Sequence, residues 1–99
     1  MPSIRTLPLR NLLLGIFLLL TACASAPVQE MSDARQAIQA AHAAGAEQIA
    51  RDTLLSARSL LEQAERELEL GHYREARRNA LNARAQAMLA RERAEQAPP

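Results

Sequence analysis

The fold is decided by residues 54–94, which read LLSARSLLEQAERELELGHYREARRNALNARAQAMLARERA. Apolar residues recur in this stretch at steps of three and four, a spacing that places them on one face of a helix. The first half carries Leu54, Ala57, Leu61, Ala64 and Leu68, and the second carries Tyr73, Ala76, Ala80, Ala83, Ala87, Ala90 and Ala94. The stretch predicts two antiparallel helices that pack closely through a coiled-coil-like seam of leucine against alanine.

A tight turn separates the two halves at Gly71 and His72. Glycine just after a helix commonly adopts the left-handed conformation that closes it. We therefore expect helices over 52–70 and 72–95, with Asp52 as the cap of the first. Three further apolar residues flank the seam, where another helix or a partner can pack: Leu60, Leu81 and Met88.

Another helix is expected before this hairpin, over residues 32–44, because the segment is rich in alanine and glutamine. Ser32 or Asp33 can cap its start, and Gly45 can end it. Two points stay open: whether this helix packs on the hairpin, and whether residues 46–51 form a loop or a helical bridge. The predicted fold is an all-α hairpin or bundle of two to three helices over residues 32–96.

Charge favours the hairpin. Glutamates crowd the end of its first helix and arginines crowd the start of its second: Glu62, Glu65, Glu67 and Glu69, then Arg74, Arg77, Arg78 and Arg84. Both placements oppose the helix dipoles, so we expect the two runs to face each other across the hairpin. Each exposed pair is worth only about 0.2–1 kcal/mol, so the pairing would set register more than stability.

The N-terminus has the layout of an export signal. Arg5 and Arg10 precede an apolar run over 12–20, and small residues follow. That run is far shorter than the roughly 20 residues that span a bilayer as a helix. We expect residues 1–22 to be a cleaved signal peptide, residues 23–31 a tether and residues 97–99 a disordered tail.

Two cleavage sites compete in this region. An ordinary secretory cut could follow an A-x-A pattern, whereas Leu20, Thr21, Ala22 and Cys23 resemble a bacterial lipobox. The lipobox resemblance implies that Cys23 receives a diacylglyceryl thioether and is acylated on its amine. Acyl chains anchor a protein to a membrane at about 0.8 kcal/mol per buried methylene. Ala24 stands where an aspartate often retains such lipoproteins in the inner membrane, which favours the outer membrane, facing the periplasm.

Two resemblances bear on the helical part. Residues 70–76 with Ala80 and Ala83 are similar to the turn and second helix of a tetratricopeptide unit, but such arrays need about three copies and only one hairpin is visible. The whole order of signal, lipobox and alanine-rich helices resembles a family of short bacterial lipoproteins whose domain has no known function. That resemblance implies an envelope location and a helical fold, and it brings no catalytic residue and no cofactor.

Composition narrows the classes of partner. The formal charge is +1 before Arg5 and Arg10 are lost, so the processed chain is slightly acidic. With one Tyr and no Trp, it has neither a basic footprint nor stacking platforms for nucleic acid. Its alanine-lined core is weak, so stability is expected to lean on a partner or on self-association.

Candidate chemistry is sparse. His42 and His72 lack the spacing of a metal site, and no serine has nucleophile-elbow glycines beside it. We therefore expect neither a metal nor an enzyme. Tyr73 is expected to close the end of the hairpin or, alternatively, to contact a partner. Arg77 and Arg78 are expected to pair across the hairpin or, alternatively, to bind cell-wall carboxylates or lipid phosphates.

These features favour a lipid-anchored periplasmic helical adaptor that binds another envelope protein or itself and has no catalytic activity. The alternative is a structural lipoprotein that links the outer membrane to peptidoglycan. Covalent attachment through a C-terminal lysine is excluded because the chain has no lysine, so that link would be non-covalent.

Overall fold

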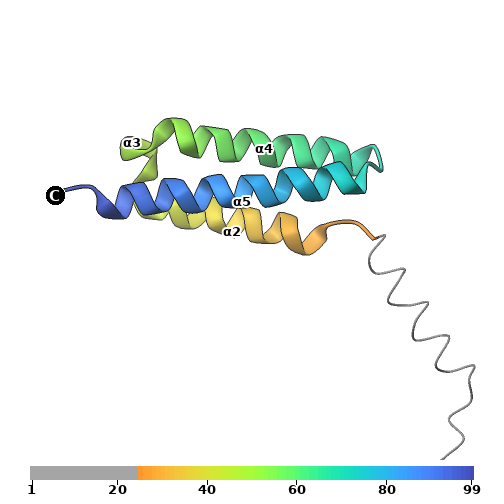
Figure 1. Cartoon of the computed structure of the whole chain (residues 1–99), viewed down its shortest axis with the longest axis horizontal. Helices are drawn as coiled ribbons and strands as arrows, with labels where there is room; N and C mark the ends of the chain where they lie inside the picture. The colour runs from red at the N-terminus through yellow and green to blue at the C-terminus, as the bar shows by residue number, and fades with distance from the viewer. Residues whose placement is uncertain (1–24) are drawn as a thin grey trace, which may run out of the picture.

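The computed structural model describes residues 25–99. The expected signal peptide, together with Cys23 and the three lipobox residues before it, lies outside the described residues. The described chain is an all-α domain of three long helices and one short one (Figure 1). They are α2 (Val28–Ala43), α3 (Ala46–Ile49), α4 (Arg51–Glu69) and α5 (Tyr73–Gln96).

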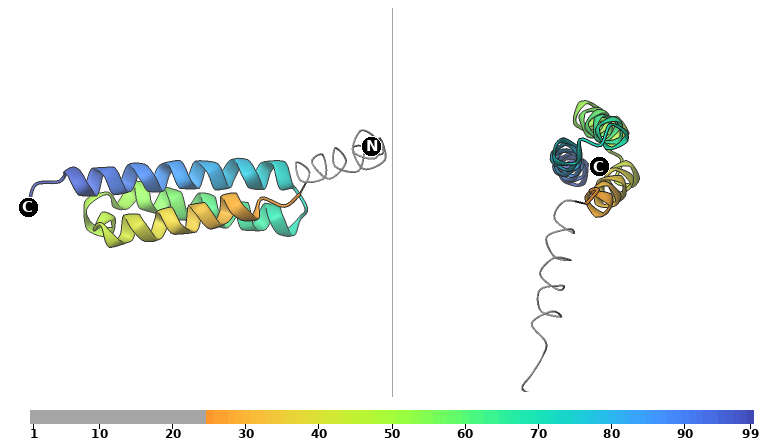
Figure 2. Two further views of the ribbon diagram at one scale, coloured as in Figure 1. Left: turned by 90° about the horizontal axis from the view of Figure 1, so that it is seen from below. Right: turned by 90° about the vertical axis from the view of Figure 1, so that its right-hand side faces the viewer.

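The two expected helices of residues 54–94 form an antiparallel hairpin, α4 and α5. Helix α2 packs on this hairpin, mainly against α5 and less against α4. The end-on view in Figure 2 shows the three long helices at the corners of a triangle. The sequence left the placement of the first helix open, and the structure settles it as part of the bundle.

Helix α5 supplies the seam that the sequence predicted. Its inward alanines are all buried: Ala76, Ala80, Ala83, Ala87, Ala90 and Ala94. Opposite them on α4, Leu54, Ala57 and Ala64 are buried, and the rest of the leucine stripe is partly so. Because alanine side chains are small, a helix lined with them can pack closely against two neighbours at once. Helix α5 does so, between α4 and α2.

The core has two clusters, one towards each end of the bundle. Met31 packs with Ala64 and Ala80 at one end, beside the α4–α5 turn. At the other end six residues pack together: Ala41, Ala46, Ala50, Leu54, Ala90 and Ala94. Met31 and Leu54 are therefore the large side chains around which an otherwise small-residue core is built.

Both glycine predictions are confirmed by the backbone. Gly71 has φ +78° and Gly45 has φ +93°, the left-handed conformation that L side chains rarely adopt. After α4, the Gly71 N–H donates to the Leu68 carbonyl at 3.0 Å and the His72 N–H donates to the Glu67 carbonyl at 2.8 Å. These two bonds are the Schellman closure of a helix end.

Three local expectations differ from the structure. Helix α2 begins at Val28 and not at Ser32, with Pro27 at its cap, so neither Ser32 nor Asp33 caps it. The reason is that Met31 is buried against the hairpin, and this packing carries the helix back past the first good capping residue. Asp52 lies in the first turn of α4, whose cap position is Ala50.

The segment 46–51 is neither a plain loop nor a continuous bridge. It holds the single turn α3, which starts after Gly45 and ends at Ile49, and at Ala50 the backbone angles φ −133° and ψ 48° break the helix. Ala46 and Ala50 are buried in the core cluster at that end, so the corner between α2 and α4 is itself packed.

Candidate interaction surface

The expected contact residues lie at the start of α5. Tyr73 is 38% exposed, and the buried part of the seam begins one turn later at Ala76. Arg77 reaches the start of α2: its Nε donates to Glu30 Oε1 at 3.2 Å and its Nη2 donates to the Ser25 carbonyl at 3.0 Å. Arg78 is exposed and has no ion-pair partner within residues 25–99.

The predicted cross-hairpin charge pairing is wrong. Among the described residues, no ion pair joins the acidic run of α4 to the basic run of α5. Glu65 pairs with Arg35 of α2 at 3.4 Å, and Glu67 pairs with His72 of the turn at 2.8 Å. The orientation of α5 about its own axis explains the difference. Its alanine seam fills the contact with α4. The side of α5 that borders α2 carries Arg77, Arg84 and Arg91, spaced seven residues apart.

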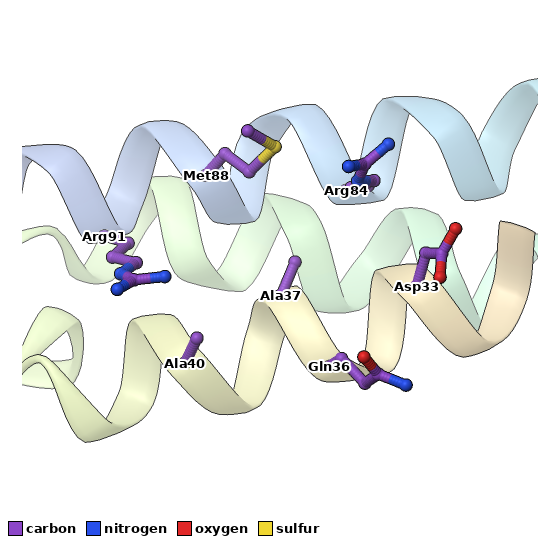
Figure 3. Close-up of a pocket in the computed structure, with 7 residues that line it drawn as sticks. All are labelled: Asp33, Gln36, Ala37, Ala40, Arg84, Met88 and Arg91. Carbon is purple, nitrogen blue, oxygen red and sulfur yellow. The ribbon is translucent and has the colours of Figure 1, made fainter.

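An open groove of about 380 Å³ runs between α2 and α5. We call it the α2/α5 groove. Figure 3 shows the side chains from both helices that line it: Asp33, Gln36, Ala37, Ala40, Arg84, Met88 and Arg91. The small side chains of Ala37 and Ala40 leave room on the α2 side, while Met88 and the two arginines stand along α5 (Figure 3).

The groove combines apolar surface with positive charge. Met88 is 54% exposed, and Leu81, one heptad earlier on the same face of α5, is 47% exposed. Arg91 Nε lies 2.7 Å from Glu95 Oε1, whereas Arg84 has no ion-pair partner in the described chain. Asp33 is the one acid in the lining, and its Oδ1 accepts a hydrogen bond from Gln29 Nε2 at 2.9 Å.

A second hollow, of about 270 Å³, lies between α2 and α4 and is lined in part by Ile38 and Leu61. Of its four charged lining residues, Arg35, Arg58 and Glu65 are already paired within the described chain and Glu62 is not. Arg35 pairs with Glu65 across it, and Arg58 pairs with Glu47 at 3.0 Å. A partner at this hollow would have to displace existing ion pairs, so the α2/α5 groove is the better candidate surface.

Glu47 of α3 ties three elements together. Its Oε2 is shielded from solvent and lies 3.0 Å from Arg58 of α4 and 3.6 Å from His42 of α2. Shielding from water raises the pKa of Glu47, but the Arg58 guanidinium and then His42 outweigh it, so the pKa falls below its ordinary value. We assign this cluster a role in holding the corner between α2 and α4.

Residues 25–99 contain no group of three or more His, Cys, Asp or Glu side chains arranged to hold a metal ion. None of the helices in that range is both long and apolar enough to cross a membrane.

The sequence had singled out part of this surface. Leu81 and Met88 were expected to flank the seam, and they do line the open face of α5. The alanines and Asp33 on the α2 side were missed as groove residues, because nothing in the sequence fixed where the first helix packs.

Comparison with known proteins places the chain in a family. A family model described as "Domain of unknown function (DUF4398)" matches residues 29–98, which covers all but the first residue of the helical domain. No curated protein and no solved structure matches the chain. Because the match covers most of its length, the chain belongs to the DUF4398 family of domains of unknown function.

Proposed function

We propose that this chain is a non-catalytic helical adaptor of the bacterial cell envelope, held on the membrane by lipid on Cys23. Its docking surface is the α2/α5 groove, which receives a helix of another envelope protein. The lipobox-like order of Leu20, Thr21, Ala22 and Cys23 supports the anchor, and Ala24 after the cysteine favours the outer membrane, facing the periplasm.

The observation that carries the proposal is the open face of α5. Helix α5 is covered by α4 on one side and by α2 on another, yet Met88 in the groove and Leu81, one heptad earlier, remain about half exposed. A helix from a partner, packed along the groove, would complete a four-helix bundle, a common architecture for antiparallel helices joined by short loops. The alanines of α2 leave the space, and the two apolar side chains of α5 provide anchors at helical spacing.

Charge decides which helix fits. The charged residues that line the groove are Arg84, Arg91 and Asp33, and Arg91 is also paired with Glu95 outside the lining. In a symmetric dimer through this groove, the same patch meets itself and the arginines of two copies come together, which is unfavourable. We therefore assign the groove to a different protein, whose helix carries small apolar residues flanked by Asp or Glu.

Site-specific photo-crosslinking in intact cells tests this assignment. A photoreactive residue replaces Met88 in the groove or, as the control, Gln63, which is exposed on α4. We expect one discrete adduct from position 88 only, mapping to an acidic helix of an envelope protein, and lost in the Cys23→Ser chain. Arg84→Glu should abolish the adduct, and Arg66→Glu, an exposed arginine of α4, should not.

Other outcomes of the crosslinking count against the proposal. An adduct of the chain with itself would replace the adaptor by a self-associating protein. Equal adducts from positions 63 and 88 would show that the groove has no special role.

A second candidate, a non-covalent link to peptidoglycan, is supported by exposed arginines of α5 that lack ion-pair partners in the described chain, among them Arg78 and Arg84. Guanidinium groups bind carboxylates, which cell-wall peptides carry. Retention on purified sacculi, lost when both arginines are replaced by alanine, would favour this reading. Arg51→Ala, an exposed arginine at the other end of the bundle, is the matched control.

A further inference from the structure

The point at which the anchor leaves the bundle is fixed. Ser25 is two residues from Cys23, so the two Cα atoms are at most about 7 Å apart. The Ser25 carbonyl accepts a hydrogen bond from Arg77 Nη2 at 3.0 Å, and Pro27 is fully buried. Only Ala24 separates Cys23 from Ser25, so there is no long flexible spacer between the anchor and the bundle. A lipid on Cys23 would therefore hold this end of the bundle close to the bilayer.

The same end carries exposed apolar side chains. The start of α2 and the turn between α4 and α5 lie together at one end of the bundle, and the C-terminus lies at the other (Figures 1 and 2). Val28 is 67% exposed, Leu70 66% and Tyr73 38%. Arg74 and Arg78, on the first turns of α5, are also exposed.

We infer that this end of the bundle, formed by Val28, Leu70, Tyr73, Arg74 and Arg78, docks on the lipid surface into which the anchor inserts. We call it the lipid-facing end. The inference rests on the proposed function, because it requires lipid on Cys23. Aliphatic side chains enter the acyl boundary, tyrosine sits at the level of the headgroups, and guanidinium groups bind lipid phosphates in a bidentate manner.

The charges around the lipid-facing end determine which interactions can hold it on the bilayer. Glu69 and Glu75 are also exposed there, and they balance Arg74 and Arg78. Glu67 is paired with His72, and Glu30 with Arg77. The end therefore has no net positive field, and docking depends on the covalent anchor, the apolar side chains and local contacts between arginine and phosphate.

Docking through this end sets the orientation of the molecule. Helix α5, with 24 residues, rises about 36 Å away from the bilayer. The α2/α5 groove then runs along the side of an upright rod, where a helix from a neighbouring envelope protein can reach it. The α3 corner and the C-terminus point away from the membrane.

The test uses the full chain, lipidated in cells, purified and reconstituted into vesicles of phosphatidylethanolamine and phosphatidylglycerol. Cys23 is the only cysteine, and acylation blocks it, so an introduced cysteine is the single labelling site. Leu70→Cys places a fluorophore at the lipid-facing end. Ile49→Cys, 52% exposed on α3 at the opposite end, is the matched control.

We expect lipids with nitroxide-labelled headgroups to quench the fluorophore at position 70 several-fold more strongly than that at position 49. Weak, equal quenching at both positions in an acylated protein would overturn the docking and leave the anchor intact. An intact mass without acyl groups would instead overturn the proposed function. A second label at Tyr73→Cys guards against a local effect of position 70 and should be quenched like it.

Discussion

At the scale of single residues, the close packing of the helices depends on buried alanines at positions with no space for a larger side chain. Ala83 is completely buried on the side of α5 that meets the rest of the bundle, whereas Ala85, two residues on, is exposed. Ala83→Leu should lower the free energy of unfolding by about 1–3 kcal/mol, because extra methylenes in a packed core force the helices apart.

Ala85→Leu is the matched control for this change, since leucine and alanine are both good helix formers. Urea unfolding of residues 25–99, followed by circular dichroism, measures both variants. If the two variants were equally stable, the seam would not be as tight as the buried alanines indicate.

Glu47 gives the residue-scale prediction on pH. Its pKa is lowered in the folded protein, so near its titration the folded state binds fewer protons than the unfolded state. The stability that it contributes is present above the ordinary glutamate pKa and is lost as the pH falls through the lowered one. Glu47→Gln should therefore destabilise the protein at neutral pH, and this difference should shrink as the solution is acidified.

Urea unfolding at a series of pH values measures the difference in the free energy of unfolding between wild type and Glu47→Gln. The series runs from pH 7 to about 3, a range that spans glutamate titration. Glu62→Gln, a change at an exposed carboxylate of α4 outside the ion pairs of the described chain, is the control. A gap for Glu47→Gln that stayed constant with pH would show that the contacts with Arg58 and His42 do not matter in solution.

At the scale of the elements, α2 is held at its start by one large side chain. Met31 is 1% exposed and packs on Ala64 and Ala80 of the hairpin. Met31→Ala should cost about 2–5 kcal/mol, the range for emptying a buried methionine site. Amide hydrogen exchange should then speed up in α2 before it does in α4 and α5.

Met88→Ala is the control for Met31, because it removes the same side chain from a position that is 54% exposed. It should change the free energy of unfolding by far less. Uniform loss of protection over all three long helices in Met31→Ala would mean that α2 does not open as a separate unit.

The sequence predicted elements better than it predicted their contacts. The three-and-four spacing of leucine and alanine gave the α4–α5 hairpin, and Gly45 and Gly71 marked the helix ends, because these signals are local. The start of α2 was missed, since it depends on where Met31 packs. The ion pairs were missed for a related reason: Arg77 meets Glu30 of α2, which the sequence had left unplaced.

At the scale of the whole molecule, the α2/α5 groove forms only when α2 packs on the hairpin. Leu81 and Met88 were recognisable as apolar residues outside the seam, but a groove needs two walls, and the second wall is α2. Likewise, the exposure of Tyr73 follows from a seam that starts at Ala76, a matter of helix rotation that spacing alone does not fix.

The shared position of α5 leads to a prediction about the whole bundle. Because α2 and α4 both pack on α5, removing α2 uncovers core that is buried in the complete domain. A hairpin of two helices with so few large side chains has little to hold it as a monomer. A chain of residues 46–99 should therefore associate through the uncovered side of α5, with helicity that rises with concentration.

Residues 25–99, by contrast, should remain monomeric, because α2 covers that side and the arginines of the α2/α5 groove oppose a symmetric contact. Sedimentation velocity and circular dichroism over a range of concentrations compare the two chains. A monomeric 46–99 chain with undiminished helicity would show that the hairpin is self-sufficient. In that case α2 would serve chiefly to form the groove and to carry the anchor, and its sequence would be free of any role in stability.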